Sequence, residues 1–348
     1  MANDHDDCTA AAAVDAGRRR WVAGLGGALL GVTAVAAGTP VAAQGEERST
    51  LLYGFPSGGP ATALLDSFVP AMKGRYQPEL AAAVRYLPGN ASRVAIEALR
   101  KAPPDGRQML MAPSSVLTLL PQLAGGSSDA VLRDLAPVAP LASFTFCLAV
   151  GPRVPASVRS LADFQAWLRD NPQQAVLGVP GLNTGAHLLG TAFARRLGTG
   201  LQFTAFQGTR PLLADLEAGT IPAGMVIVGA APEAFAAGRL RGLLVTSEAR
   251  WPSVPDWPTG RELGLIDTPL VESFGLYVHR DTAPSRIEAL AEAVRGALTA
   301  APMRQTVERL AMRLPAPDIT PDDFRFALLA ESQGWGTLLA SGEMQKYR

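Results

Sequence analysis

Buried strands and amphipathic helices alternate along most of the chain. An apolar run at 51–55 precedes a helical pattern over 61–72, where Leu64, Leu65 and Phe68 recur on one face. Segments that alternate in this way build a parallel sheet with helical crossovers. Further strands are predicted at 82–87, 108–112, 145–150, 175–179, 201–205, 224–228, 241–246 and 274–279. Further helices are predicted at 93–100, 161–169, 184–196, 211–217, 284–300, 303–310 and 321–340, with a short one from Ser115.

The alternation predicts two α/β lobes. The final helices bring no strands of their own, so they are expected to pack on the first sheet, which places both ends of the chain in one lobe. We expect 44–147 and 273–348 to form this lobe and 148–272 to form the second. Strands near Phe146 and Tyr277 would cross between them. Two lobes joined in this way can close on a ligand by a hinge motion.

Residues 1–43 differ from the rest of the chain. The basic run Arg18-Arg19-Arg20-Trp21 precedes a mildly apolar stretch at 22–37 and a series of small residues that ends at Ala43. This order is typical of a cleavable export signal cut after Ala43, and the paired arginines resemble a twin-arginine signal. The apolar stretch is shorter than the ~20 residues that a membrane anchor, the alternative, would need. We therefore expect a periplasmic protein.

Composition and charge exclude several classes of function. The chain has 31 basic and 31 acidic residues, so it lacks the basic balance on which nucleic-acid binding depends. Its cysteines are Cys8 and Cys147, and only the second would remain after cleavage, which excludes an internal disulfide. The sequence contains no metal-ligand motif, phosphate-binding loop or nucleophile elbow. We expect no cofactor, no metal and no enzymatic activity.

One enzymatic alternative stays open at this point. Ser114 or Ser115 could pair with His187 across the cleft as an acyl-transfer site. Two lobes that converge on one ligand explain the same residues without catalysis.

The first candidate loop, Phe55-Pro56-Ser57-Gly58-Gly59-Pro60, joins the first strand to the first helix. Such a connection lies at the carboxyl edge of a parallel sheet, where ligands bind. Its two glycines let the backbone approach a ligand, and the free N–H groups at a helix start favour an anion. The alternative is a plain Gly-Pro turn. The candidate ligand-binding residues here are Phe55, Ser57, Gly58, Gly59, Pro60, Ala61 and Thr62.

A second loop, at 179–187, repeats this arrangement in the other lobe. A strand ends, a glycine-containing loop follows, and Asn183 or Thr184 caps the next helix. Two such loops facing each other would hold a carboxylate by main-chain donors. His187 falls in the first helical turn, where a packing role behind the loop is the alternative to ligand contact. The candidates here are Gly181, Asn183, Thr184, Gly185 and His187.

Several motifs follow one another in a characteristic order between residues 50 and 348. They lie at 55–60, 101–106, 206–208, 244–247, 254–259 and 275–277. In this order and spacing they resemble the receptors of tripartite tricarboxylate transporters, often called Bug proteins. The resemblance implies a two-lobe periplasmic binding protein fold of type II. Each lobe would be a mostly parallel sheet flanked by helices, and two crossing strands would join the lobes.

The resemblance also implies a function. Such a receptor captures a small carboxylate between its lobes, largely through main-chain groups of the two loops, and delivers it as a monomer to a membrane permease. A ligand sensor that docks on a membrane kinase uses the same closure and stays an alternative. Further candidate ligand-binding residues are Ser114, Ser115, Gln207, Gly208 and Gly229.

Departures from the family pattern bear on the ligand. Thr62 stands where many members have an aspartate, Gln207 where they have a lysine, and 228–229 where an acidic residue is common. Fewer charges in the cleft argue against an amino-acid ligand. We expect a less polar or aromatic carboxylate.

Overall fold

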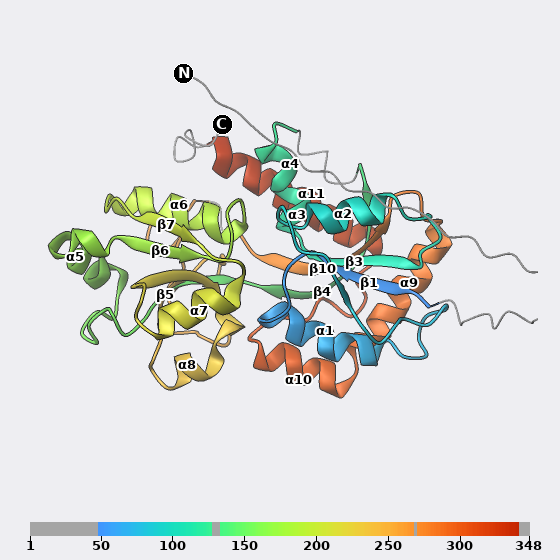
Figure 1. Cartoon of the computed structure of the whole chain (residues 1–348), viewed down its shortest axis with the longest axis horizontal. Helices are drawn as coiled ribbons and strands as arrows, with labels where there is room; N and C mark the ends of the chain where they lie inside the picture. Colours follow the sequence, from blue (N-terminus) through green and yellow to red (C-terminus); the bar gives the residue numbers. More distant parts are fainter. Residues whose placement is uncertain (1–47, 127–132, 268–269, 341–348) are drawn as a thin grey trace, which may run out of the picture. The chain divides into compact units, whose positions relative to one another are not determined.

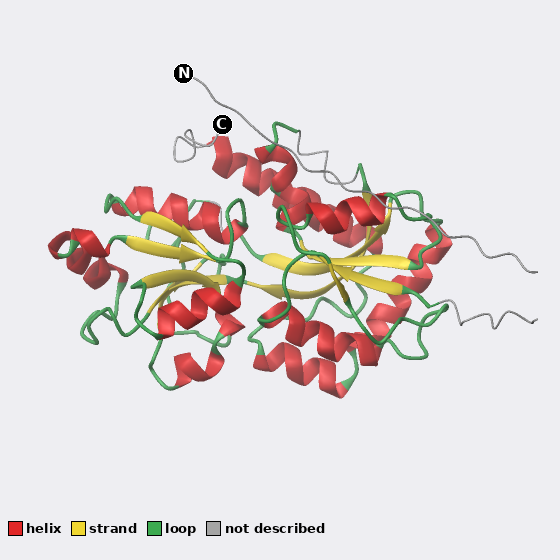
Figure 2. Cartoon of the chain, in the orientation of Figure 1, coloured by secondary structure: helices red, strands yellow, loops and turns green. Residues whose placement is uncertain are grey.

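The computed structural model describes residues 48–126, 133–267 and 270–340. Within these ranges the strands form two five-stranded sheets with helices packed against them (Figures 1 and 2). The predicted α/β fold class, with two sheet-and-helix lobes, is therefore confirmed. The expectation that each sheet is mostly parallel is confirmed only in part, because both sheets are mixed. The predicted export signal at 1–43 lies outside the described residues.

The first sheet has the strand order β2-β1-β3-β10-β4. The strands β1, β2 and β3 run parallel, whereas β10 runs antiparallel to both of its neighbours, β3 and β4. The sheet is thus parallel on one side and antiparallel on the other. The strand bounds are β1 Thr50–Tyr53, β2 Arg85–Tyr86, β3 Gln108–Pro113, β4 Leu135–Phe144 and β10 Glu272–His279. The helices that accompany its N-terminal strands are α1 Pro60–Ala71, α2 Arg93–Arg100, α3 Ser115–Thr118 and α4 Leu120–Leu123.

The C-terminal helices return to the first sheet, as the sequence predicts. They are α9 Pro284–Leu298, α10 Ala301–Arg309 and α11 Pro321–Ala340. Both α9 and α11 contact β4, and α10 packs on α1. No helix in the described part of the chain has both the length and the apolar character that crossing a bilayer requires.

The second sheet has the strand order β7-β6-β8-β5-β9. Here β7, β6 and β8 run parallel, and β5 runs antiparallel to β8 and β9. The strand bounds are β5 Phe146–Val150, β6 Val176–Val179, β7 Gln202–Ala205, β8 Ala223–Ile227 and β9 Arg241–Val245. The helices are α5 Leu161–Asp170, α6 Gly185–Leu197, α7 Thr209–Glu217 and α8 Pro232–Ala236, with short 3₁₀ turns at Pro172–Gln174 and Val228–Ala230.

One long strand, β4, has no counterpart among the predicted elements. It contains Pro137 and Pro140, which lack the N–H that a central strand would donate. In the described sheet β4 lies at the edge, where such residues are tolerated. The strand predicted at 82–87 is reduced to β2.

The chain passes between the sheets at two neighbouring points. It leaves the first sheet between β4 and β5 at Thr145 and returns between β9 and β10. The hydroxyls of Thr145 and Thr246 lie 3.0 Å apart, and Phe146 N–H donates to Thr246 Oγ1 at 3.2 Å. Thr246 Oγ1 also donates to Leu270 O at 3.3 Å. These hydrogen bonds tie the two passages together.

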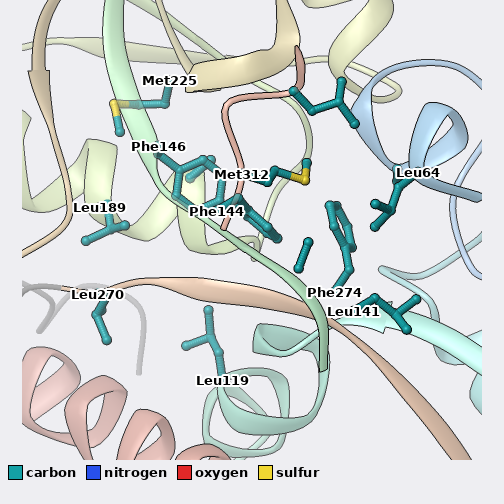
Figure 3. Packing of buried hydrophobic residues seen from close by; sticks show 14 of the residues in the cluster. Leu64, Leu119, Leu141, Phe144, Phe146, Leu189, Met225, Leu270, Phe274 and Met312 are labelled. Carbon is teal, nitrogen blue, oxygen red and sulfur yellow. The ribbon is translucent and has the colours of Figure 1, made fainter. Parts of the chain in front are cut away.

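An apolar cluster lies around these passages (Figure 3). The ring centroids of Phe144 and Phe274 lie 4.6 Å apart, and those of Phe144 and Phe146 lie 5.6 Å apart. Met225 of the second sheet and Met312, which follows α10, are buried in the same cluster. Burial of each such side chain contributes about 1.5–3 kcal/mol. The cluster therefore supports the segment from which the candidate site is built.

Candidate functional site

A cavity of about 180 Å³ lies where loops from both sheets meet. Its walls include the loops after β1 and β6, the end of β3, and the starts of α1, α6 and α7. The carboxyl ends of parallel strands and the helix N-termini that follow them are the usual ligand-binding elements of α/β proteins. This cavity is the candidate ligand site.

Most of the residues predicted for the site meet in this cavity. The first loop and the turn after β3 contribute Phe55, Ser57, Gly58, Pro60, Ala61 and Ser115. The second sheet contributes Asn183, Thr184, Gly185, Gln207 and Gly208. The remaining predicted residues lie outside the lining: Gly59, Thr62, Ser114, Gly181, His187 and Gly229.

Backbone conformation explains the glycines of the first loop. Gly58 has φ 110° and Gly59 has φ 77°, both in the left-handed region that favours glycine. Thr62 Oγ1 accepts a hydrogen bond of 2.7 Å from Gly58 N–H. Thr62 thus closes the loop on itself, and Pro60 occupies the first turn of α1.

The second loop is closed by a helix cap. Of the two predicted caps, Asn183 and Thr184, the structure shows Thr184 as the N-cap of α6. Its Oγ1 accepts a hydrogen bond from His187 N–H. The same hydroxyl donates to Gly181 O at 2.9 Å. Asn183 N–H donates to His187 Nδ1 at 3.2 Å, and the His187 ring meets Phe203 edge-on. His187 is therefore placed behind the loop, and burial lowers its pKa.

The structure gives Gly229 a packing environment. Gly229 lies in the 3₁₀ turn after β8, and an added Cβ would lie 1.6 Å from Leu310 O. Real Cβ atoms do not approach a backbone oxygen so closely. This position therefore requires glycine for the contact with the end of α10.

Two charged side chains in the cavity were not among the predicted residues. One is Arg210, at the start of α7, whose side chain packs on Gly58 of the opposite loop: a Cβ added to Gly58 would lie 3.3 Å from Arg210 Cδ. A local signal exists for it, because Arg210 follows the predicted residue Gly208 by two positions.

The other is Glu272, at the start of β10, which is 2% exposed and lines the cavity. The sequence signal is faint: a single acidic residue precedes the largely apolar run at 274–278. Ser115 Oγ donates to its Oε2 at 2.6 Å, whereas its Oε1 is buried with no hydrogen-bond partner.

A second carboxyl lies near Glu272. Glu331 of α11 accepts hydrogen bonds from Thr118 Oγ1 at 2.7 Å and from Trp335 Nε1 at 3.1 Å. Burial, together with the charge of Glu331, raises the pKa of Glu272 to about 8. Burial also raises the pKa of Glu331, to about 6, against the effect of its hydrogen-bond donors. Glu272 is therefore the carboxyl of the pair that retains its proton to higher pH.

Aromatic rings form much of the remaining wall. Tyr53 and Phe55 lie with centroids 5.7 Å apart and both line the cavity. Phe144, Phe146 and Phe274, which Figure 3 labels in the buried apolar cluster, line it as well. Such a wall suits a ligand with an apolar carbon skeleton.

The acyl-transfer alternative finds no support in this geometry. Neither Ser114 nor His187 lines the cavity. Ser114 Oγ accepts from Ser273 N–H at 3.0 Å, and His187 Nδ1 accepts from Asn183 N–H. Within the described residues, no group of three or more His, Cys, Asp or Glu side chains is arranged to hold a metal ion.

Comparison with known proteins gives one consistent family. Residues 81–332 match the family described as tripartite tricarboxylate transporter family receptor. Protein BugT of Bordetella pertussis is 28% identical over 253 residues, which cover 71% of this chain and 75% of that protein.

Solved structures share the fold. MatC from Rhodopseudomonas palustris with bound malate has a TM-score of 0.73 at 22% identity and covers 86% of this chain and 100% of that chain. A second R. palustris protein, Rpa4515 with adipate, has a TM-score of 0.73 at 23% identity and covers 84% and 96%. At these identities the likeness shows the fold.

Proposed function

Because the chain belongs to the tripartite tricarboxylate transporter receptor family, we propose that it is a receptor that binds one small carboxylate in the cavity. It acts outside the cytoplasm and delivers its ligand to a membrane permease of the tripartite type. The receptors of this family bind solutes, and binding without chemical conversion is the activity proposed for this chain.

The polar wall of the cavity is the observation that carries the proposal. The loop of Gly58 and the start of α6 line the cavity from opposite sheets. Among the described lining residues, Arg210 is the only lysine or arginine. A guanidinium and helix N-termini favour an anionic oxygen group. The aromatic wall accommodates the carbon skeleton that carries it.

The ligands of two structural relatives narrow the class of acid. Malate in MatC and adipate in Rpa4515 are both dicarboxylates. Dicarboxylates with a short aliphatic chain are therefore the first candidates for this cavity, and aromatic monocarboxylates the second.

Ligand capture is proposed to occur by closure of two lobes. The first consists of 44–147 together with 273–348, and the second consists of 148–272. The cavity is lined from both sheets, and the chain passes between them only near Thr145 and Thr246 within the described residues. Few connections of this kind allow a hinge motion.

A carboxylate ligand is expected to raise the melting temperature of the protein. A ligand that binds only the folded state at a concentration of 100 times its Kd stabilises that state by about 2.7 kcal/mol. For a protein of this size, the shift is roughly 4 °C. A thermal-shift screen of mono- and dicarboxylates against sugars and amines measures it. Shifts with sugars or amines and none with any acid would overturn the proposal.

Export is proposed to use the twin-arginine route, on the basis of the predicted signal. Replacing Arg18, Arg19 and Arg20 together by Lys is expected to stop export, because that route reads the paired guanidinium groups. Immunoblots of periplasmic and cytoplasmic fractions measure the distribution. Unchanged periplasmic yield would exclude this route and leave the binding proposal intact.

A further inference from the structure

The buried carboxyl of Glu272 has one oxygen engaged and one oxygen without a partner. Ser115 Oγ donates to Oε2, so Oε2 acts as an acceptor. Oε1 lies beside Gly185, where an added Cβ would stand 1.9 Å from it, and Gly185 also lines the cavity. No protein group in the described residues makes a hydrogen bond to Oε1. A buried oxygen of this kind at a ligand cavity points to a partner supplied by the ligand.

The surroundings favour a neutral carboxylic acid. The charged neighbour that acts on Glu272 is Glu331, a second acid, and the wall beside it includes Phe274 and Val116. A buried carboxylate without a cation is costly, so the group keeps its proton instead. The titratable groups on the elements around Glu272 include Glu331 on α11, Tyr277 on β10, Tyr53 on β1, His187 on α6 and Arg210 on α7.

A proton on Oε1 agrees with the hydrogen bonds. It leaves Oε2 as the acceptor for Ser115 Oγ, 2.6 Å away, and gives the partnerless Oε1 a hydrogen to donate. Oε1–H is then a donor beside Gly185 in the cavity wall.

We propose that Glu272 binds the ligand directly as a neutral acid, donating an O–H hydrogen bond from Oε1 to an oxygen acceptor of the ligand. This inference rests on the proposed function and deepens it. The receptor selects acids that present a carboxylate or carbonyl oxygen to Glu272, and it discriminates against ligands that present an ammonium group there. The discrimination arises because a neutral acid offers a donor and no charge to an ammonium group.

The inference predicts that binding weakens with rising pH. The neutral form donates to the ligand, whereas the ionised form loses the donor and repels a carboxylate. Affinity is thus retained below the pKa of Glu272, which is about 8, and is lost above it. Between pH 7 and pH 9 the affinity for a fully ionised dicarboxylate should fall about tenfold.

Calorimetric titration of a carboxylate panel that includes malate and adipate tests this inference. Glu272→Gln keeps the shape and a donor but cannot ionise, so it should bind at pH 7 within a few-fold of the wild type and show no weakening at pH 9. Glu331→Gln is the matched control, because Glu331 is outside the cavity lining. Removal of the Glu331 charge should lower the pKa of Glu272, so the loss of affinity should begin at lower pH but still occur.

Amino analogues distinguish the two possible ligand chemistries. Aspartate carries an ammonium group in place of the hydroxyl of malate, and 2-aminoadipate is adipate with an added ammonium group. One outcome would overturn the inference: the amino analogues bind more tightly than malate and adipate, their affinity rises with pH, and Glu272→Gln loses that binding. The proposed function as a carboxylate receptor would still stand. The inference is also overturned if the carboxylate affinities of the wild type and Glu272→Gln fall equally as the pH rises. If no acid of the panel binds the wild type, the proposed function fails and the inference with it.

Discussion

A Gly229→Ala substitution is expected to destabilise the folded protein by at least about 3 kcal/mol, the upper part of the usual range for overpacking. The added Cβ would lie 1.6 Å from Leu310 O and 2.2 Å from the Leu310 carbonyl carbon. These are backbone atoms, so no side-chain rotation relieves the clash. The turn after β8 and the end of α10 would have to move apart. Urea unfolding with circular dichroism measures the loss.

The matched control is Gly296→Ala. Gly296 lies inside α9, and the nearest atom to an added Cβ is Arg75 Nη1 at 3.5 Å, an ordinary contact. Alanine is favoured over glycine in a helix interior by about 0.5–1 kcal/mol, so this variant should be as stable as the wild type or slightly more stable. Equal stability of Gly229→Ala and the wild type would show that the contact with Leu310 does not govern this position.

A Gly59→Val substitution is expected to reduce carboxylate affinity at least about tenfold while the protein still folds. Gly59 is the N-cap of α1 with φ 77° and ψ −171°, a region that is nearly exclusive to glycine and costs other residues about 1–3 kcal/mol. The branched side chain would also press on Thr209, whose Cβ lies 3.5 Å from the ideal Cβ position. Thr209 and the neighbouring Gly58 both line the cavity. Strain at Gly59 therefore displaces both sides of the site.

Thr184→Ala provides the comparison within the other loop. It removes the N-cap acceptor of α6 and the bond to Gly181 O, a loss of about 1 kcal/mol, and leaves the backbone conformation unstrained. Its effect on affinity should be modest. Calorimetric titration of the three proteins with the acid that gives the largest thermal shift decides the order. Unchanged affinity in Gly59→Val would place the ligand elsewhere.

Local patterns in the sequence are sufficient to predict most of the helices and strands. The loops at 55–60 and 179–187 are predictable because each combines a strand end, glycine and a helix start in a short stretch. Their meeting in one cavity follows from the order of strands and helices, since loops at the carboxyl ends of parallel strands converge.

The missed features depend on contacts between distant segments. Pro137 and Pro140 argue against a strand locally, and only the position of β4 at a sheet edge allows one. Glu272 meets Ser115 and Glu331 only after the chain has returned from the second sheet. The requirement for glycine at position 229 likewise arises from Leu310, far along the sequence.

Two charged residues also revise the expectation about the ligand. The sequence suggested a cleft with few charges, but the cavity includes Arg210 and Glu272. The first supplies a cation for a carboxylate, and the second, as a neutral acid, supplies a donor without a negative charge. The preference for an acid without an amino group is therefore kept, for a different physical reason.

Native mass spectrometry tests the central claim, that this protein binds one small carboxylate. The wild-type protein would be incubated with an equimolar mixture of dicarboxylates, aromatic acids, sugars and amines, and the bound species identified by mass after ejection. We predict a complex with one molecule of a carboxylic acid for the wild type and its loss in Gly59→Val. A bound sugar or amine, or no adduct on the wild-type protein, would contradict the account.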